Sequence, residues 1–279
     1  MHGRSPHPTP NTDGTTMKNV RIEIADRIAT VTLARPPVNA LDAVTFRELT
    51  EAFQQLGRTR EASVIVFTAE GDRLFCGGVD LQDSVRRHAR ELAEGDTTVD
   101  LLDPGALPRD CFNAVLDCPL PVIAAVNGMA IGAGVALVAS CDIIIASTQA
   151  RFSVPEIKAG VLGGARHLQR LVGPYKTRKM FFTGEVVDAH EFHRLGAVEA
   201  VVAPEELMPA ALALARQIAG MSPIGLRLAK ESMNRAEEMS LKDGYRVEQD
   251  YTGRVTRYAD SAEAREAYRG KREPNWSWK

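Results

Sequence analysis

The sequence is poor in cysteine and in aromatic residues, and neither sign of charge is in large excess. Only 4 of its 279 residues are cysteines, and none of them forms a C-x-x-C pair. This usage argues against a disulfide scaffold and against a zinc site, so we expect no metal and a reducing, cytoplasmic location. Lys and Arg number 34 against 36 for Asp and Glu, a formal net charge of −2. Such a balance favours neither nucleic acid nor an anionic membrane as a partner.

Charged residues are absent from residues 118–141, a stretch of 24. About 20 apolar residues are enough to cross a bilayer. Two prolines and the Asn127-Gly128 pair interrupt this stretch, however, and its flanks are the acidic Asp117 and Asp142 rather than basic anchors. We therefore predict no membrane span, but a buried strand at residues 121–126 and a buried helix from about 132 to 140.

The chain divides by composition into a leader, a core and a helical end. Residues 1–16 are rich in Pro, Thr, Asn and Gly and lack the apolar stretch of a signal peptide, so we expect a disordered leader. Strand and helix patterns alternate through about the first 150 residues, and the rest is mostly helical. We predict an α/β core at residues 17–215 and a helical C-terminal region at 216–279.

Hydrophobic periodicity predicts the individual elements. Strands are expected at 21–25, 28–34, 63–68, 142–146 and 200–202, with the first two joined as a hairpin, and 150–154 is expected to be extended. Asp42 is placed to cap a helix that ends near Leu56. Further helices are expected at 81–94, 109–116, 165–171, 175–182, 189–195, 205–219, 222–236, 241–258 and 261–269.

Two glycine-rich turns are candidates for a binding site. One covers residues 75–80 after a predicted strand, and the other covers residues 127–134 before a predicted buried helix. Glycines allow close approach of the backbone, and a helix N-terminus offers free N–H groups, so two converging turns would suit a developing oxyanion. Tight packing is the alternative interpretation of each turn. A dinucleotide site is disfavoured because Leu137 occupies the third glycine position after Gly132 and Gly134.

Glu156 follows Pro155 directly after an apolar segment and is the candidate acid or base. An apolar setting disfavours the ionised carboxylate and raises its pKa toward the range that serves proton transfer. A surface glutamate in a helix-initiating loop is the alternative. The sequence contains none of the motifs G-x-S-x-G, H-E-x-x-H and G-x-x-x-x-G-K-[ST]. The two glycine-rich turns and Glu156 are therefore the candidates for a catalytic site.

Together these residues resemble the crotonase family, the enoyl-CoA hydratase/isomerase group, over about residues 22–271. The resemblance rests on residues 33–42, 75–81, 122–147 and 151–160. It implies an α/β fold built as a spiral of ββα units, with C-terminal helices that mediate assembly into a homotrimer or a dimer of trimers. It also implies an acyl-CoA substrate and no cofactor other than the coenzyme A that the substrate carries.

The resemblance further implies roles for particular residues. The amides of Val79 and Ala133 match the two oxyanion donors, and Glu156 matches a catalytic glutamate. The resemblance also implies that Tyr268 and Lys271 reach the CoA phosphates. The full set of residues expected to contact the substrate is Arg35, Pro36, Val38, Ala40, Gly78, Asp80, Leu81, Gly132, Gly163, Tyr268 and Lys271.

One departure from the family pattern bears on the reaction. Hydratases of this family hold a water between two glutamates, and the first of these aligns with Ala136. A single glutamate resembles the arrangement of enoyl-CoA isomerases, so double-bond isomerisation is favoured. The alternatives are a hydrolase or decarboxylase, in which Arg166, His167 or Asp83 would supply the missing group, and a non-catalytic CoA-binding relative.

Overall fold

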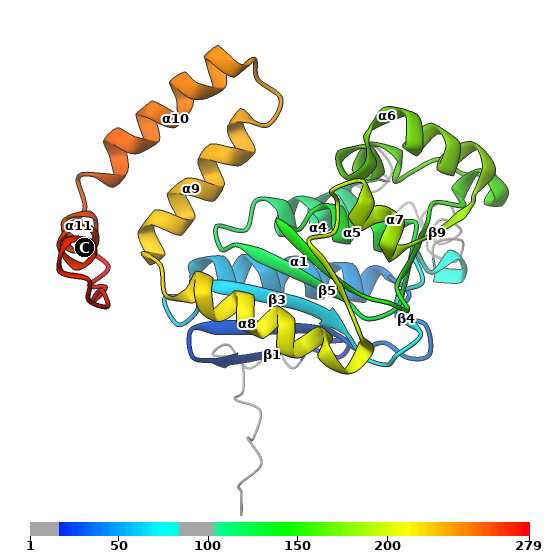
Figure 1. Ribbon diagram of the computed structural model, residues 1–279. Helices are drawn as coiled ribbons and strands as arrows, with labels where there is room; N and C mark the ends of the chain where they lie inside the picture. The colour runs from blue at the N-terminus through cyan, green and yellow to red at the C-terminus, as the bar shows by residue number, and fades with distance from the viewer. Residues whose placement is uncertain (1–16, 84–102, 104) are drawn as a thin grey trace, which may run out of the picture.

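The structure is a computed structural model that describes residues 17–83, 103 and 105–279 (Figure 1). The predicted leader and most of the predicted helix at 81–94 lie outside the described residues. In the part of the chain that is described, no helix has the length and apolar character needed to span a membrane.

A six-stranded sheet forms the centre of the molecule. Its order is β1 (Val20–Ala25), β2 (Ile28–Leu33), β3 (Val64–Ala69), β5 (Val122–Val126), β7 (Ile143–Ser147) and β10 (Ala200–Val202). The β1–β2 hairpin is antiparallel, as predicted, and every later pairing in this sheet is parallel. Strand β3 is buried along its whole length, which is why it reads as an unbroken apolar run.

Helices cover both faces of this sheet, and alternate residues of each strand face opposite layers. Ile65 and Phe67 of β3 join the cluster formed with α1 (Ala43–Arg58) and α4 (Ala106–Leu116). Val64 and Val66 instead pack against α8 (Leu207–Ala219). Helix α8 crosses in front of β3 in Figure 1 and contacts the sheet through residues four apart, namely Leu207, Ala211, Ala215 and Ala219.

A second, four-stranded sheet was not predicted. It has the order β4 (Leu74–Cys76), β6 (Met129–Ile131), β8 (Arg151–Ser153) and β9 (Val186–Asp188). Each strand has only 3 residues, too few to show a period in the sequence. Only β8 coincides with a segment expected to be extended. This small sheet carries the two glycine-rich turns.

The helix caps and helix boundaries mostly agree with the sequence. Asp42 caps α1, because its Oδ1 accepts a hydrogen bond of 2.7 Å from the amide of Thr45. Helix α5 (Ala133–Ala139) lies within the predicted 132–140. The two helices predicted at 165–171 and 175–182 are confirmed as two helical stretches of α6 (Ala165–Thr183), separated by a kink at Gly173, whose backbone angles are non-helical.

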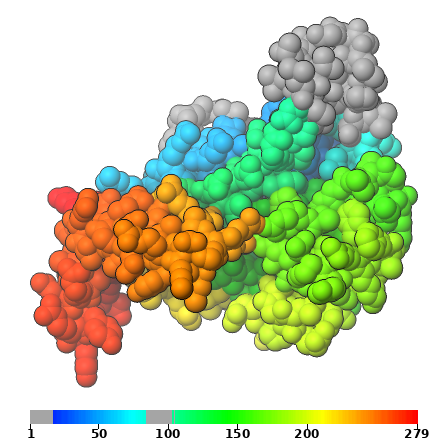
Figure 2. All heavy atoms as spheres, turned by 90° about the horizontal axis from the view of Figure 1, so that it is seen from above, coloured from blue at the N-terminus to red at the C-terminus, as the bar shows by residue number. Residues whose placement is uncertain are grey.

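The C-terminal part forms an arm that begins with a helix docked to the core and ends with two helices that stand away from the sheets. It consists of α9 (Pro223–Ala236), α10 (Leu241–Val255) and α11 (Ala259–Gly270), coloured orange to red in Figure 1. The remaining short elements are η1 (Glu156–Ala159), α7 (Ala189–Arg194) and η2 (Pro204–Glu206). The predicted domain division after residue 215 falls within α8 and stays a prediction. Seen from above, the arm reaches the green segment that includes α6 (Figure 2).

Candidate active site

A pocket of about 300 Å³ opens where the two glycine-rich turns, η1 and α4 meet. Its walls come from four chain segments that are distant in sequence. The lining residues are Gly77, Gly78, Val79, Leu81, Pro108, Phe112, Ile131, Gly132, Ala133, Ala136, Pro155, Glu156, Ala159, Val161, Leu162, Gly163 and Gly164. Of the predicted site residues, the structure therefore brings together Val79, Ala133 and Glu156 with Gly78, Leu81, Gly132 and Gly163.

The first turn presses directly on the N-terminus of α5. Gly78 has a φ of 89°, and a Cβ atom there would lie 3.0 Å from the carbonyl oxygen of Ile131 and 3.9 Å from the amide nitrogen of Ala133. The turn is also paired with Leu41, whose amide donates to Gly78 and whose carbonyl accepts from Asp80. These two hydrogen bonds do not involve the amide of Val79, which lies between Gly78 and Asp80 and has no acceptor among the described residues.

The second turn leaves the first amide of α5 available. Gly132 precedes the helix with a φ of 53° and donates its own amide to the carbonyl of Ser153 at 2.9 Å. The following amide, that of Ala133, makes no hydrogen bond within the described part of the chain. Since the first N–H groups of a helix have no partner inside it, the Ala133 amide is a donor facing the pocket. The expected convergence of two glycine-rich turns is thus present.

Glu156 places its carboxylate over the same turn. A Cβ atom at Gly132 would lie 2.6 Å from Oε1 of Glu156, and one at Gly164 would lie 3.3 Å from it. Oε2 of Glu156 is buried without a hydrogen-bond partner among the described residues. Burial raises the pKa of the Glu156 carboxyl above its usual value. The pocket therefore holds a partly desolvated carboxyl group with one unpaired oxygen beside two free amides.

Among the described residues that line the pocket, none besides Glu156 has an ionisable side chain. Ala136 is fully buried one turn into α5, where its methyl group occupies the position that a carboxylate would need. Phe112 and Pro108 of α4 close the pocket on another side, at helical i, i+4 spacing. The site can accept or release a proton through Glu156 alone among its described lining residues.

Comparison with known proteins decides the family. A family model described as enoyl-CoA hydratase/isomerase matches residues 23–279. The chain belongs to this family. The crotonase fold class expected from the sequence is confirmed by solved structures of enoyl-CoA hydratase from Bacillus anthracis (TM-score 0.84, 28% identity, 94% of this chain and 100% of that one) and of Pseudomonas aeruginosa DspI (TM-score 0.85, 30%, 96% and 100%).

Curated members of the family carry different activities in their names. A protein of Mycobacterium tuberculosis named (7aS)-7a-methyl-1,5-dioxo-2,3,5,6,7,7a-hexahydro-1H-indene-carboxyl-CoA hydrolase is 37% identical over 241 residues, 86% of this chain and 94% of that protein. The short-chain-enoyl-CoA hydratase of Clostridium acetobutylicum is 32% identical over 260 residues, 92% and 96% respectively. Family membership alone therefore leaves the reaction open.

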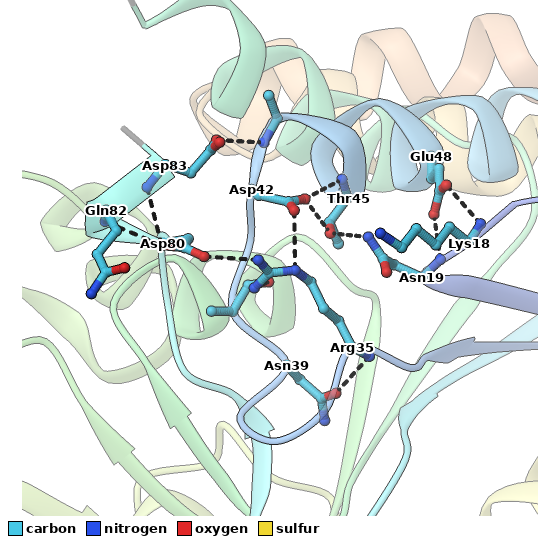
Figure 3. Close-up of polar contacts among 12 residues, drawn as sticks. Lys18, Asn19, Arg35, Asn39, Asp42, Thr45, Glu48, Asp80, Gln82 and Asp83 are labelled. Atoms are coloured by element: carbon cyan, nitrogen blue, oxygen red, sulfur yellow. Dashed lines mark hydrogen bonds and ion pairs between the residues drawn. The ribbon is translucent and has the colours of Figure 1, made fainter. Parts of the chain in front are cut away.

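Arg35 lies beside the pocket and makes internal contacts. Its Nε lies 3.1 Å from Oδ2 of Asp42 and its Nη2 lies 2.8 Å from Oδ2 of Asp80, while Nη1 donates to the carbonyl of Ala40 (Figure 3). The hydrogen bond from Arg35 is the main cause that holds the pKa of Asp80 below its usual value. Arg35 and Asp80 thus tie the segment after β2 to the first turn. Pro36 and Val38 lie exposed on this segment.

Tyr268 and Lys271 are not brought to the pocket within one chain. Both belong to the α11 end of the arm, which lies on the far side of the molecule from β4 (Figures 1 and 2). Tyr268 is 87% exposed there. Their role toward CoA stays a prediction.

Phe112 lines the pocket but was not predicted from the sequence. Conversely, Arg166, His167 and Asp83 were suggested as possible catalytic groups but do not line the pocket. Phe112 gives no motif signal, since an aromatic residue in a helix is usually part of the core. His167 packs edge-on against Phe112 with ring centroids 5.1 Å apart, and Arg166 pairs with Glu238. Asp83 accepts a hydrogen bond of 3.0 Å from the amide of Ala43, at the start of α1.

Proposed function

We propose that this protein acts on an acyl-CoA thioester and stabilises an enolate formed from it. In this proposal the Val79 and Ala133 amides donate to the thioester oxygen, and Glu156 removes a proton from the acyl chain. The observation that carries the proposal is the half-buried Glu156 carboxylate, whose Oε2 has no hydrogen-bond partner among the described residues, beside these two free amides. An oxyanion donor of this kind is typically worth about 2.7–4 kcal/mol in the transition state.

Double-bond isomerisation is the reaction that we favour. Glu156 takes a proton from C2 of a 3-enoyl thioester, and the electron pair of that C–H bond moves toward the thioester oxygen. The same carboxylic acid then returns the proton at C4, which leaves a 2-enoyl thioester and restores the carboxylate. No water has to be held, which fits a pocket in which Ala136 stands at the position of the first glutamate of the hydratases.

Hydrolysis of an acyl-CoA substrate is the second candidate. It is supported by the name of the 37% identical relative, which is called a carboxyl-CoA hydrolase. One carboxylate can activate one water, so hydrolysis also fits a site with Glu156 alone.

Product analysis separates these reactions. We would incubate the wild-type protein with trans-3-hexenoyl-CoA, crotonyl-CoA and a saturated acyl-CoA, and follow the conjugated enoyl absorbance, hydroxyacyl formation and free thiol. Formation of the conjugated 2-enoyl thioester is expected. Thiol release would instead establish hydrolysis, and tight CoA-ester binding without any product would contradict an enzyme and favour a binding role.

Ala136→Glu tests the role of the missing carboxylate. With a second carboxylate to hold water, the variant is expected to gain hydration of crotonyl-CoA relative to wild type. Ala136→Gln has a similar size without a charge and serves as its control. Equal hydration by wild type and both variants would show that another group already replaces the first glutamate.

The raised pKa of Glu156 predicts a pH dependence with opposite signs for activity and stability. The base must be ionised, so kcat/KM is expected to rise through a midpoint above 4.5, the ordinary glutamate value. The folded chain holds this proton more tightly than the unfolded chain, so the Glu156 contribution to stability falls as the pH rises through the same range. Rate profiles, and urea unfolding of wild type and Glu156→Gln over about pH 4–8, check this. A rate profile without an acid limb above 4.5 would contradict it.

We also propose a homotrimer or a dimer of trimers. The arm exposes large apolar side chains, among them Met233 at 65%, Leu241 at 90% and Tyr245 at 58%, which support burial against another copy. Such an assembly would also be needed to bring Tyr268 and Lys271 to a pocket, since their own pocket lies far away. Sedimentation equilibrium is expected to give three or six copies.

A further inference from the structure

Helix α9 is docked to the core through a seam of polar side chains. Arg227 donates to the carbonyl of Thr59, Lys230 to that of Leu120 and Asn234 to that of Leu116, at 2.8, 3.0 and 2.8 Å. These donors are three or four residues apart, so they lie on one face of α9. The seam ends just beyond the helix at Glu237 and Glu238, which pair with Arg170 and Arg166 of α6.

Arg170 joins this seam to the helix that borders the pocket. Its Nη1 donates to the carbonyls of Ala139 and Cys141, the latter at 3.4 Å, at the C-terminal end of α5. Its Nε donates to Oε1 of Glu237 at 2.8 Å. The last carbonyls of a helix have no partner inside it, and a cation at this end interacts favourably with the helix dipole. Arg170 therefore holds one end of α5 while Ala133 stands at the other.

Helix α5 is short and buried along its whole length, so its two ends lie close together. Its 7 residues are all buried, and at 1.5 Å per residue they span only about 10 Å. A shift of its C-terminal end therefore moves the Ala133 amide and the Ala136 methyl group with it. A misplacement of about 1 Å at a reacting centre costs on the order of 10²-fold in rate.

We propose that Arg170 is a positioning residue that fixes α5, and through it the Ala133 amide, and that Glu237 couples this contact to the arm. The inference rests on the proposed function, because it assigns the Ala133 amide to the reacting oxygen. Neither Arg170 nor Glu237 lines the pocket, so neither touches the substrate in this proposal.

The test compares Arg170→Met with Arg170→Lys, Glu237→Gln and the control Lys179→Met. Lys179 also lies on α6 and pairs with a glutamate, Glu185, but that pair contacts neither α5 nor the arm. Arg170→Met is expected to lower kcat by about 10- to 100-fold with KM changed less than about threefold. Arg170→Lys should recover part of the loss, Glu237→Gln should lose less, and Lys179→Met should match wild type.

Hydrogen–deuterium exchange of the α5 amides gives a readout that does not depend on turnover. Exchange is expected to rise in Arg170→Met and not in Lys179→Met. Faster exchange with unchanged kcat would overturn the positioning role and leave a structural one, and unchanged exchange would overturn the whole inference. A wild-type protein without turnover on any thioester would refute the proposed function, while the exchange experiment would still decide whether Arg170 fixes α5.

Discussion

Glu156→Gln is expected to lower kcat by about 10²- to 10⁴-fold, the usual contribution of a positioned acid or base. The amide has nearly the same size as the carboxylate but accepts no proton at neutral pH. KM should change little, because the substitution leaves the pocket walls and the two free amides in place. Steady-state kinetics on the substrate that wild type converts provides the measurement. Undiminished turnover would remove Glu156 from the mechanism.

Gly132→Ala is the companion variant that keeps the carboxylate and disturbs its place. The added methyl group would lie 2.6 Å from Oε1 of Glu156. The φ of 53° at this position is also unfavourable for residues other than glycine. A comparable loss of kcat is expected if the position of the carboxylate matters as much as its charge. Gly253→Ala on α10 is the control, since its methyl group would meet no atom within 4 Å.

Lys230→Ala is expected to lower the free energy of unfolding by about 3 kcal/mol, the lower end of the range for breaking a buried ion pair. The Lys230 side chain is 3% exposed, and its Nζ lies 2.7 Å from Oδ2 of Asp142. Its removal leaves the carbonyl of Leu120 without this donor and leaves Oδ2 of Asp142 without a cation, bonded among the described residues only to the amide of Val122 at 2.7 Å. We take the lower end because the Asp142 side chain stays 20% exposed and keeps some water. Urea unfolding at neutral pH measures the loss.

A matched surface pair makes the comparison specific. Arg235 pairs with Glu231 on the same helix, four residues apart, and its side chain is 62% exposed. Arg235→Ala is expected to cost less than about 0.5 kcal/mol, as exposed helical pairs do. The double variant Lys230→Met with Asp142→Asn should regain part of the single-variant loss, because no buried charge is then left alone. Equal losses for Lys230→Ala and Arg235→Ala would show that the polar seam contributes no more than surface charge.

Local signals explain which parts of the fold could be predicted. The β1–β2 hairpin alternates apolar and polar residues, and Asp42 carries a capping side chain, so both were found. The small sheet was missed because its strands are set by neighbours far along the chain rather than by their own period. The break between the helices predicted at 165–171 and 175–182 was also found, because Gly173 and Pro174 are helix breakers and the backbone of Gly173 is non-helical.

The candidate site shows the same division. The glycine-rich turns and Glu156 were found from their own residues, the resemblance to the crotonase family assigned Val79 and Ala133 within those turns, and the structure places all three on one pocket. Phe112 could not be predicted, because only the packing of α4 across α1 and α5 turns its ring toward that pocket. The sequence also could not show that the guanidinium group of Arg35 forms ion pairs with Asp42 and Asp80.

The outer wall of the pocket has a consequence for how the family diversifies. Residues 159–163 line or border the cavity, yet all are exposed, Leu162 to 81%, and none belongs to the hydrophobic core. Exposed substitutions away from special contacts change stability by only about ±0.5 kcal/mol. Mutation can therefore explore the chemistry of this wall while the sheets and the two amide donors stay intact. Substitutions here can change the acyl group that fits the pocket with little change in the stability of the fold. This is consistent with a family whose members are named hydratase, dehydratase and hydrolase.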